Sequence, residues 1–542
     1  MNIIVRAIAL ALAGLSFSWV SLISVPPVIP DQTDLDTLAD TTLQADRSLA
    51  GSIAQANTPD ATADDLLSRR RQHEITNFVG EPGSLFPRVI DPTPTPAPIA
   101  PANPLPANPA VPNPVVPAPT LDPSPNVVII NLDDARADVM EVLPSVERWF
   151  GDEGVTFNNA YVTTPSCCPS RATLMTGQLV HNNGQVDQNT PLTDESTSIQ
   201  RYLSDSGYFT GHVGKYLHYY DLDEQAPYWD RWAYYRGGYI DVPFFIDGEF
   251  NRAEQHSTIE TFDLAIDQLE SFEQRDDDRP FYLHIAPVAP HRPLIPEEQY
   301  ANAPVPEWDP SPAVFEANRS DKPPWVSFLS VTPEEGEEFR TGQLRLLMSV
   351  DDQVDRFMRR LTALGEADNT IAIFTSDNGV FWGEHGRNSK FLPYNEAIEV
   401  PFLVRWPGQL DAGSVRDDFI THPDILPTVL SAVEVDWAHR IDGRNIFDPG
   451  FSRDNVFTEY FFDVDNNNGI PDWSSIRNED RVYTEYYDEA GAVIFEEYYD
   501  LQSDRFELVN LLGNAATFDD PDVTADRQLL RSARNCSGSS CQ

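Results

Sequence analysis

The chain has 542 residues, 41% of them hydrophobic, so it is long enough to bury a sizeable core. Its 85 acidic residues outnumber 37 basic residues and give a formal net charge of −48. This charge argues against nucleic acid and against anionic membrane surfaces as partners, because both would repel the chain.

Residues 1–125 fall into three segments of different composition. Residues 1–30 carry one positive charge at Arg6, and an uncharged, mostly apolar run follows over residues 7–25. This run predicts export and fits either a signal peptide, which we favour, or a membrane anchor that tethers the protein. Residues 31–90 are polar and acidic, and residues 91–125 are rich in proline. We expect the first to have little order and the second to form an extended linker.

The globular part is predicted to begin at Asn126 and to form a catalytic domain over residues 126–450. Residues 127–130 are a continuous run of β-branched residues, typical of a buried strand. An apolar stripe at helical spacing follows over residues 342–364, and a second apolar strand is predicted at 370–375. This alternation predicts an α/β fold with a mixed, mainly parallel sheet flanked by helices on both faces.

The pattern changes in residues 451–542, which we expect to form a small antiparallel-sheet subdomain. Residues 481–487 and 493–499 are typical of two short strands, and the turn signal Asp-Glu-Ala-Gly between them predicts a β-hairpin. The acidic segment 463–472 is similar to a calcium-binding loop, but its glycine comes one residue late. An asparagine-rich turn is therefore favoured over a second calcium site.

Acidic side chains follow both predicted buried strands. Asp133 and Asp134 come after the first strand, and Asp377 and Asn378 come after the later one. The carboxyl ends of parallel strands meet at one edge of a sheet, where ligands bind. Three carboxylates and an amide oxygen are hard ligands, suited to Ca²⁺ or Mg²⁺ rather than to zinc.

The four cysteines form two close pairs. Cys536 and Cys541 flank a short loop that suits a disulfide and an oxidising compartment, although two free thiols also fit. Cys167 and Cys168 alone would fit two small buried residues or a vicinal disulfide. The run Cys-Cys-Pro-Ser-Arg over residues 167–171, with Leu-Met-Thr-Gly at 174–177, is more specific. It resembles the sulfatase signature C-x-P-S-R followed by L-x-T-G.

The resemblance to sulfatases extends over about residues 125–542. It includes residues 374–379, 383–386 and 400–408, and a C-terminal pattern at 499–511. The aromatic segment 226–235 and the tail at 536–541 are similar to the N-acetylglucosamine-6-sulfatase-like branch. The resemblance implies an alkaline-phosphatase-like fold. It also implies that a formylglycine-generating enzyme converts Cys167 to formylglycine, whose hydrate is the nucleophile.

The resemblance also assigns roles to individual residues. Asp133, Asp134, Asp377 and Asn378, with an oxygen of residue 167, would bind the metal, usually Ca²⁺, with Mg²⁺ as the alternative. Arg171 would hold the formylglycine hydrate, and Lys215, His291 and Lys390 would bind the sulfate. Lys390 would also protonate the leaving alkoxide.

His218 departs from the family pattern. Many sulfatases have a catalytic histidine two residues after the lysine, whereas His218 comes three residues after Lys215. The glucosamine 6-sulfate branch often has asparagine at the position of His218. His218 is therefore either the base that deprotonates the hydrate or a polar contact, whereas His212 and His385 are expected to be structural.

These observations predict an exported sulfatase, extracellular, periplasmic or at the cell surface. Its expected substrates are sulfated carbohydrates, with aryl sulfates as simple analogues, and no nucleic acid. The aromatic residues at 226–235 suit either sugar stacking or core packing, with packing favoured. Two other functions remain open. One is a phosphate or phosphonate ester hydrolase of the same superfamily, and the other is a catalytically silent protein that binds sulfated glycans.

Overall fold

A computed structural model describes residues 124–542, except 276, 278, 328–329, 464–468 and 519. The predicted signal peptide or anchor at 1–30, the acidic segment at 31–90 and all but the end of the linker at 91–125 lie outside the described residues. Within the described part of the chain, no helix is long and apolar enough to cross a membrane.

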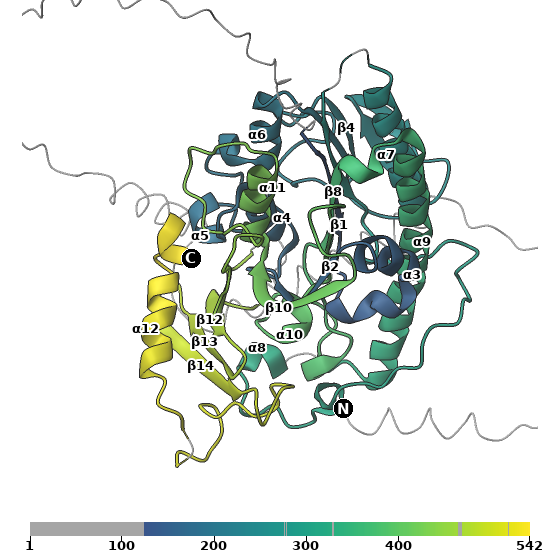
Figure 1. The fold of residues 1–542 in the computed structure, drawn as a ribbon. Helices are drawn as coiled ribbons and strands as arrows, with labels where there is room; N and C mark the ends of the chain where they lie inside the picture. The colour runs from purple at the N-terminus through teal and green to yellow at the C-terminus, as the bar shows by residue number, and fades with distance from the viewer. Residues whose placement is uncertain (1–123, 276, 278, 328–329, 464–468, 519) are drawn as a thin grey trace, which may run out of the picture. The chain divides into compact units, whose positions relative to one another are not determined.

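Among these residues, ten strands form one mixed sheet (Figure 1). In spatial order the strands are β10 (Ser414–Thr421), β2 (Val155–Tyr161), β9 (Phe402–Arg405), β8 (Thr370–Ser376), β1 (Asn126–Leu132), β7 (Phe281–Ala286), β3 (Phe209–Gly214), β4 (Arg231–Tyr234), β5 (Pro243–Ile246) and β6 (Glu249–Arg252). The central strands β8, β1, β7, β3 and β4 run parallel, whereas β9, β5 and β6 pair antiparallel with their neighbours. The mainly parallel sheet predicted from the sequence is thus confirmed.

Helices cover both faces of this sheet (Figure 1). One face carries α3 (Pro144–Val146), α7 (Ser257–Glu273) and α9 (Pro333–Leu364), and the other carries α4 (Cys167–Thr176), α6 (Ile199–Asp205) and α11 (Ile425–Ala432). Short helices α5 (Val180–Asn183), α8 (Pro324–Ser327) and α10 (Asn395–Ile398) lie in the connections.

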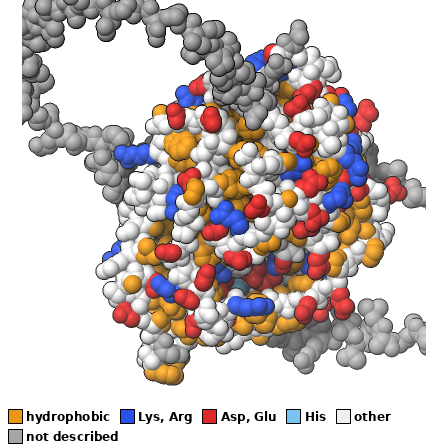
Figure 2. All heavy atoms as spheres, in the orientation of Figure 1, with side chains coloured by type: hydrophobic (Ala, Val, Ile, Leu, Met, Phe, Trp, Pro, Cys, Tyr) orange, Lys and Arg blue, Asp and Glu red, His pale blue; other side chains and the backbone are white. Residues whose placement is uncertain are grey.

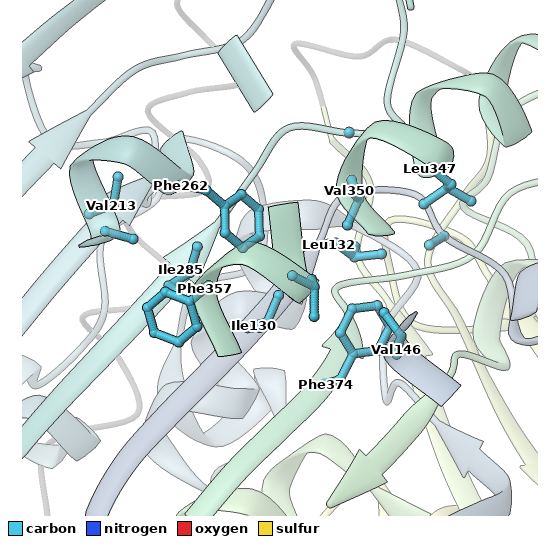
Figure 3. Close-up of a cluster of buried hydrophobic side chains, with 14 of the residues drawn as sticks. Ile130, Leu132, Val146, Val213, Phe262, Ile285, Leu347, Val350, Phe357 and Phe374 are labelled. Carbon is cyan, nitrogen blue, oxygen red and sulfur yellow. The ribbon is translucent and has the colours of Figure 1, made fainter. Parts of the chain in front are cut away.

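Strand β1 shows why its sequence is a continuous apolar run. Ile130 and Leu132 pack in one core cluster with Val350 and Phe357 of α9, whereas Ile129 packs in the cluster on the opposite face. Figure 3 shows the first of these clusters, with side chains from the strands and from the covering helices facing one another. Because successive residues of a strand point to opposite faces, a strand covered on both sides needs apolar residues at every position.

Helix α9 begins earlier than the apolar stripe at 342–364 predicts. The Thr332 side chain accepts a hydrogen bond from the Glu335 amide, the Glu335 side chain accepts one from the Thr332 amide, and Pro333 occupies the first turn. This capping box starts the helix at Pro333. The helix ends at Leu364, where Gly365 adopts φ = 88°. The first two turns were missed because their polar residues do not continue the stripe.

A second, antiparallel sheet is formed by the C-terminal part of the chain. It consists of β11 (Val456–Tyr460), β12 (Trp473–Arg477), β13 (Arg481–Tyr487) and β14 (Val493–Asp500), and α12 (Thr524–Ala533) packs on it. The predicted hairpin at 481–499 is therefore confirmed as β13 and β14. In the acidic segment 463–472, residues 464–468 lie outside the described residues.

The C-terminal loop is closed by the predicted disulfide between Cys536 and Cys541. The Cys536 carbonyl accepts a hydrogen bond from Asn182 Nδ2 at 3.0 Å, and the Gly538 amide donates to Asp442 Oδ1 at 2.6 Å. The other oxygen of Asp442 accepts from the Leu179 amide at 2.8 Å. The loop is therefore fastened to the segment that directly follows α4.

Candidate active site

Four acidic and amide side chains meet where β1 and β8 end. The two strands are parallel and in register up to Leu132 and Ser376, so the residues that follow them emerge side by side. Asp133, Asp377 and Asn378 are fully buried, and Asp134 is nearly so. The Asp134 amide donates to Asp377 Oδ1 at 3.2 Å, and Asn378 Nδ2 donates to Asp134 Oδ1 at 2.6 Å. The predicted ligand residues thus form one cluster at the carboxyl edge of the sheet.

Helix α4 brings Cys167 to this cluster as its first residue, and all ten residues of the helix are buried. Cys167 Sγ lies 3.7 Å from Asp133 Oδ1 and 2.8 Å from Lys390 Nζ. Burial raises the pKa of the Cys167 thiol to about 12, although the charges of Lys215 and Lys390 oppose that shift. The unmodified side chain is therefore a neutral thiol at physiological pH and a weak nucleophile.

Three cations are interleaved with the carboxylates. Lys215 Nζ donates to Asp133 Oδ2 at 2.5 Å, Arg171 Nε donates to Asp377 Oδ2 at 2.9 Å, and Lys390 Nζ donates to Asp134 Oδ1. All three cations are almost completely buried. Three carboxylates therefore face three cations, so the cluster is formally neutral as it stands. An isolated buried charge would be costly, and each is compensated here by a partner at hydrogen-bond distance.

The pKa shifts of two carboxyl groups differ because their neighbours differ. Burial alone would raise the pKa of Asp133, but the charges of Lys215, His291, Arg171 and Lys390 together hold it well below its ordinary value. Burial and the neighbouring Asp133 raise the pKa of Asp377 instead. Of these two groups, Asp133 thus keeps its negative charge more firmly than Asp377 does.

His291 lies next to the acidic residues, whereas the sequence analysis expects it to bind the sulfate. Its Nε2 is 3.8 Å from Asp134 Oδ2, and its ring is about one-third exposed. One potential ligand atom from each of Asp133, Asp134, Cys167 and His291 lies within 4.8 Å of the others. His291 therefore lies at the mouth of the cluster, where it can contact either an ion or a substrate.

His218 lies at the edge of the same cluster. Burial, Lys215 and Arg236 lower the pKa of His218 to about 3, so its ring is neutral at physiological pH. Its Nε2 is buried and has no hydrogen-bond partner among the described residues. A buried imidazole nitrogen without a partner can accept a proton or a hydrogen bond from a ligand.

Two residues that the sequence analysis did not single out support the site. Gln343 of α9 donates from Nε2 to the carbonyls of Asp134 and Pro290, at 3.2 and 3.3 Å, and so links the loops after β1 and β7. His422 lies 3.2 Å from the Ser170 hydroxyl, within the signature helix. A polar residue on the buried face of α9 was the available signal for Gln343, whereas no local signal identified His422.

Histidine and carboxylate side chains form a second buried group away from this cluster. Atoms of His385, Glu396 and Glu507 lie within 4.8 Å of one another. Both oxygens of Glu507 already have partners, since Arg477 donates to one at 2.8 Å and the Asn395 amide to the other at 3.2 Å. His385 Nδ1 lies 2.7 Å from Glu316 Oε2. This group therefore has partners within the protein for much of its charge.

The aromatic segment 226–235 belongs mainly to the core. Trp229, Trp232, Tyr234 and Tyr235 are at most 3% exposed, whereas the Tyr228 side chain is 36% exposed. His212 lies among these rings, 5.3 Å from Trp229 between ring centroids. Core packing is therefore the interpretation that fits most of the segment, and only Tyr228 could meet a sugar ring.

The chain matches two protein-family models. Residues 125–435 match the sulfatase model, and residues 383–530 match the model for the C-terminal part of N-sulphoglucosamine sulphohydrolase. The extracellular sulfatase SULF-1 homolog of Drosophila melanogaster is 30% identical over 351 residues, which are 59% of this chain but 31% of that protein. This chain therefore spans less than one-third of the length of that relative.

Relatives of similar length to this chain also occur. Human N-acetylglucosamine-6-sulfatase is 27% identical over 486 residues, covering 77% of this chain and 86% of the human protein. A structure described as a complex with its substrate D-glucosamine-2-N,6-O-disulfate superposes with a TM-score of 0.66 at 22% identity. That comparison covers 75% of this chain and 96% of the other and supports the fold. The chain belongs to the sulfatase family, and it is similar to the N-acetylglucosamine-6-sulfatase-like branch of that family.

Proposed function

We propose that this protein hydrolyses sulfate esters of sulfated sugars or polysaccharides, with formylglycine at position 167 and one Ca²⁺ ion. The observation that carries the proposal is the position of Cys167. It lies between Asp133 and Lys390 in a cluster of three carboxylates and three cations. Relatives named N-acetylglucosamine-6-sulfatase favour a sulfated glucosamine as the substrate.

The donor set suits a hard divalent cation. Asp133, Asp134, Asp377 and Asn378 offer oxygen atoms within one buried cluster, and Ca²⁺ prefers carboxylate and amide oxygens. Mg²⁺ is the alternative, because the same oxygens can bind it. When bound, the ion supplies positive charge that polarises the S–O bonds and favours deprotonation of a nearby hydroxyl. It would also change the charge of the formally neutral cluster to +2, which favours an anionic substrate.

A modified side chain at residue 167 suits the proposed reaction better than a thiol does. A thiol with a pKa near 12 is a weak nucleophile at neutral pH, and attack on sulfur would leave a thiosulfate with no easy route to turnover. A formylglycine hydrate supplies two hydroxyls, one to attack sulfur and one to expel sulfate afterwards. Lys390 Nζ already lies at hydrogen-bond distance from this side chain, and Arg171 lies one helical turn further along α4. A maturation enzyme is therefore a required partner.

The cations have separate tasks in this proposal. Lys215 and Lys390 donate hydrogen bonds to sulfate oxygens and stabilise the negative charge that develops there. The Asp134 charge and burial act on Lys390 in opposite directions, and the net pKa of Lys390 lies above its ordinary value, so this residue carries a proton at the working pH. Lys390 is thus charged when the substrate binds. We propose that it gives its proton to the leaving alkoxide, and that His291 contacts the ester side of the sulfate.

His218 is proposed to accept a proton from the hydrate. Its neutral ring and unpartnered Nε2 leave a lone pair available. A bound anionic group nearby would raise the pKa of His218 from its low value and make it a better base. The alternative role, a polar contact to substrate, would use the same nitrogen as an acceptor.

The cellular setting is also part of the proposal. Relatives named extracellular sulfatases and the disulfide at Cys536–Cys541 support export. Residues 1–30 would direct that export, residues 91–125 would act as a linker, and residues 126–450 and 451–542 would form the catalytic domain and the C-terminal subdomain.

Rates on matched aryl sulfate and aryl phosphate esters test the reaction. The protein is co-expressed with a formylglycine-generating enzyme, mass spectrometry measures conversion at position 167, and hydrolysis is assayed with Ca²⁺. We expect sulfate to be the preferred ester. Replacement of the nucleophile, Cys167→Ala, should lower kcat by at least about 10³-fold, because loss of a covalent nucleophile typically costs that much or more.

The controls separate the rival functions. Cys168→Ala, at the neighbouring buried cysteine, should still be converted at position 167 and should keep activity. Wild-type-like turnover by Cys167→Ala would falsify the mechanism, and preference for phosphate would favour the phosphoesterase alternative. Glycan binding without hydrolysis by fully converted protein would favour the silent binding protein.

A further inference from the structure

Cations lie beyond the acidic cluster at the carboxyl edge of the central sheet. The strands lie in the order β8, β1, β7, β3, β4 and run parallel, so the segments after them are neighbours in that order. Acidic residues follow β8 and β1. Basic residues follow the next three strands: His291 and Arg292 after β7, Lys215 and His218 after β3, and Arg236 after β4. The proposed ion site thus occupies one side of this edge, and cations extend away from it on the other.

Arg292 is an exposed cation at the mouth of the site. It directly follows His291, and its guanidinium lies 3.9 Å from the centroid of the Phe339 ring of α9. Among the ion pairs of the described residues, none pairs Arg292 with a carboxylate within 4 Å. Burial lowers the pKa of Arg292 and the Asp134 charge opposes that shift, so the guanidinium lies within electrostatic reach of the cluster. Stacking on Phe339 fixes its plane and leaves its N–H groups available.

Arg236 is held beside His218. Its two terminal nitrogens donate to the carbonyls of His218 and Tyr220, at 2.6 and 2.9 Å. Carbonyl partners fix the side chain without neutralising its charge. The loop that carries Arg236 packs on the loop of His291, because the Tyr239 hydroxyl donates to the His291 carbonyl at 2.6 Å. Each arginine therefore lies next to a histidine of the candidate site, and their two loops are in contact.

These arginines differ from the buried cations of the cluster. Arg171, Lys215 and Lys390 are each bonded to a carboxylate, so they contribute little net charge. Arg292 and Arg236 are exposed and have no carboxylate partner among the described ion pairs, in a chain with a net charge of −48. An exposed arginine is usually only solvated. Here two of them are oriented by stacking and by backbone bonds, and they lie beside His291 and His218 of the candidate site.

We propose that Arg292 and Arg236 bind a second anionic group of the substrate, so that the preferred substrate is a sulfated glycan unit with another sulfate or a carboxylate beside the ester that is cleaved. This inference rests on the proposed sulfatase activity. Guanidinium groups bind such oxyanions in a bidentate manner. A substrate with one charge would occupy only the Lys215, His291 and Lys390 side of the site.

The test compares two defined substrates, N-acetylglucosamine 6-sulfate and glucosamine 2-N,6-O-disulfate, in the converted, calcium-loaded protein. The measured quantity is the ratio of kcat/KM for the disulfated over the monosulfated sugar. We expect Arg292→Gln to lower this ratio by about tenfold or more, as loss of a charge-assisted hydrogen bond would do. The effect should lie mostly in KM, and Arg292→Lys should restore part of it.

A matched variant controls for the loss of any surface charge. Arg505→Gln removes an exposed arginine of the C-terminal part of the chain that, like Arg292, lies over an aromatic ring, that of Phe506, and it should leave the ratio unchanged. An Arg292→Gln ratio equal to that of wild type, or a ratio that falls equally in Arg505→Gln, overturns the inference. If the wild-type protein cleaves neither sugar nor an aryl sulfate, the sulfatase proposal itself fails, which is a different result.

Discussion

Two buried groups of carboxylates in this protein differ in the groups to which they are hydrogen-bonded. In the first, Asp133, Asp134 and Asp377 bond mainly to lysine and arginine side chains around Cys167. In the second, the two oxygens of Glu507 bond to an arginine and to a backbone amide that also hold the C-terminal part of the chain in place. Lysine partners can turn toward a substrate when an ion arrives, whereas a backbone partner cannot. The comparison teaches that a cluster of carboxylates suggests an ion site only when an ion can take the place of the groups that are hydrogen-bonded to those carboxylates.

The largest expected difference between the two groups is in the response to calcium. Asp377→Asn removes one carboxylate from the first group and leaves Arg171 without its partner at 2.9 Å. We expect wild-type protein to be stabilised by about 2.7 kcal/mol at a calcium concentration of 100 times Kd. The variant should lose most of that gain and most of its turnover. Thermal unfolding with and without calcium, after treatment with a chelator, measures the effect.

An equal shift of Tm by calcium in Asp377→Asn and in wild type would contradict the proposed ligand set. Glu507→Gln serves as the matched control, since it removes a buried carboxylate from the second group. Its calcium-dependent shift should remain that of wild type.

The same Glu507→Gln variant should be destabilised in the absence of calcium. It leaves the nearly buried Arg477 guanidinium without a charged partner, and breaking a buried ion pair typically costs about 3–5 kcal/mol. Denaturant unfolding at constant pH measures this cost. A free energy of unfolding within error of that of wild type would mean that the second group does not stabilise the fold.

A smaller effect is expected from Glu396, which has a buried oxygen without a partner. Burial and the charge of Glu384 raise the pKa of Glu396 from 4.5 to about 7. The folded state therefore binds this proton more tightly than the unfolded state. The resulting stability is fully present below pH 4.5 and is lost as the pH rises through about 7.

Glu396→Gln should remove this part of the pH dependence. We expect its stability relative to wild type to increase between pH 5 and pH 8, by roughly 1.4 kcal/mol for each unit of pKa shift that is realised. Unfolding midpoints across that pH range measure the difference. A constant difference between variant and wild type would show that Glu396 titrates normally.

Much of the fold could be predicted because its signals are local. The apolar runs of β1 and β8, the stripe of α9 and the β13–β14 hairpin all follow from short-range periodicity. The acidic residues of the candidate site were found for a related reason, since they directly follow buried strands.

The missed features depend on contacts between distant segments. Gln343 is one helix residue among many until the fold places it between the Asp134 and Pro290 carbonyls. Arg236 and Arg292 are 56 residues apart in sequence, and only the order β7, β3, β4 brings their loops together. Strand order results from long-range packing, so sequence periodicity does not reveal it.

The charge of the whole chain and the charge around Cys167 bear on different properties of the protein. Acidic and basic side chains are intermixed over the visible face, as Figure 2 shows. A charge count of the whole chain predicts repulsion of an anionic substrate, whereas the local arrangement around Cys167 is neutral. The global charge therefore bears on solubility and partners, and the local cluster bears on chemistry.

The fastening of the Cys536–Cys541 loop behind α4 has a consequence for timing during synthesis. The loop bonds through Cys536 to Asn182, which lies 354 residues earlier in the chain. Residue 167 precedes Asn182, so the ribosome synthesises it more than 350 residues before this loop. Until that loop docks, the segment around residue 167 lacks its final support, and afterwards Cys167 is only 5% exposed. Any enzyme that modifies this residue thus acts after the residue has been synthesised and before folding is complete.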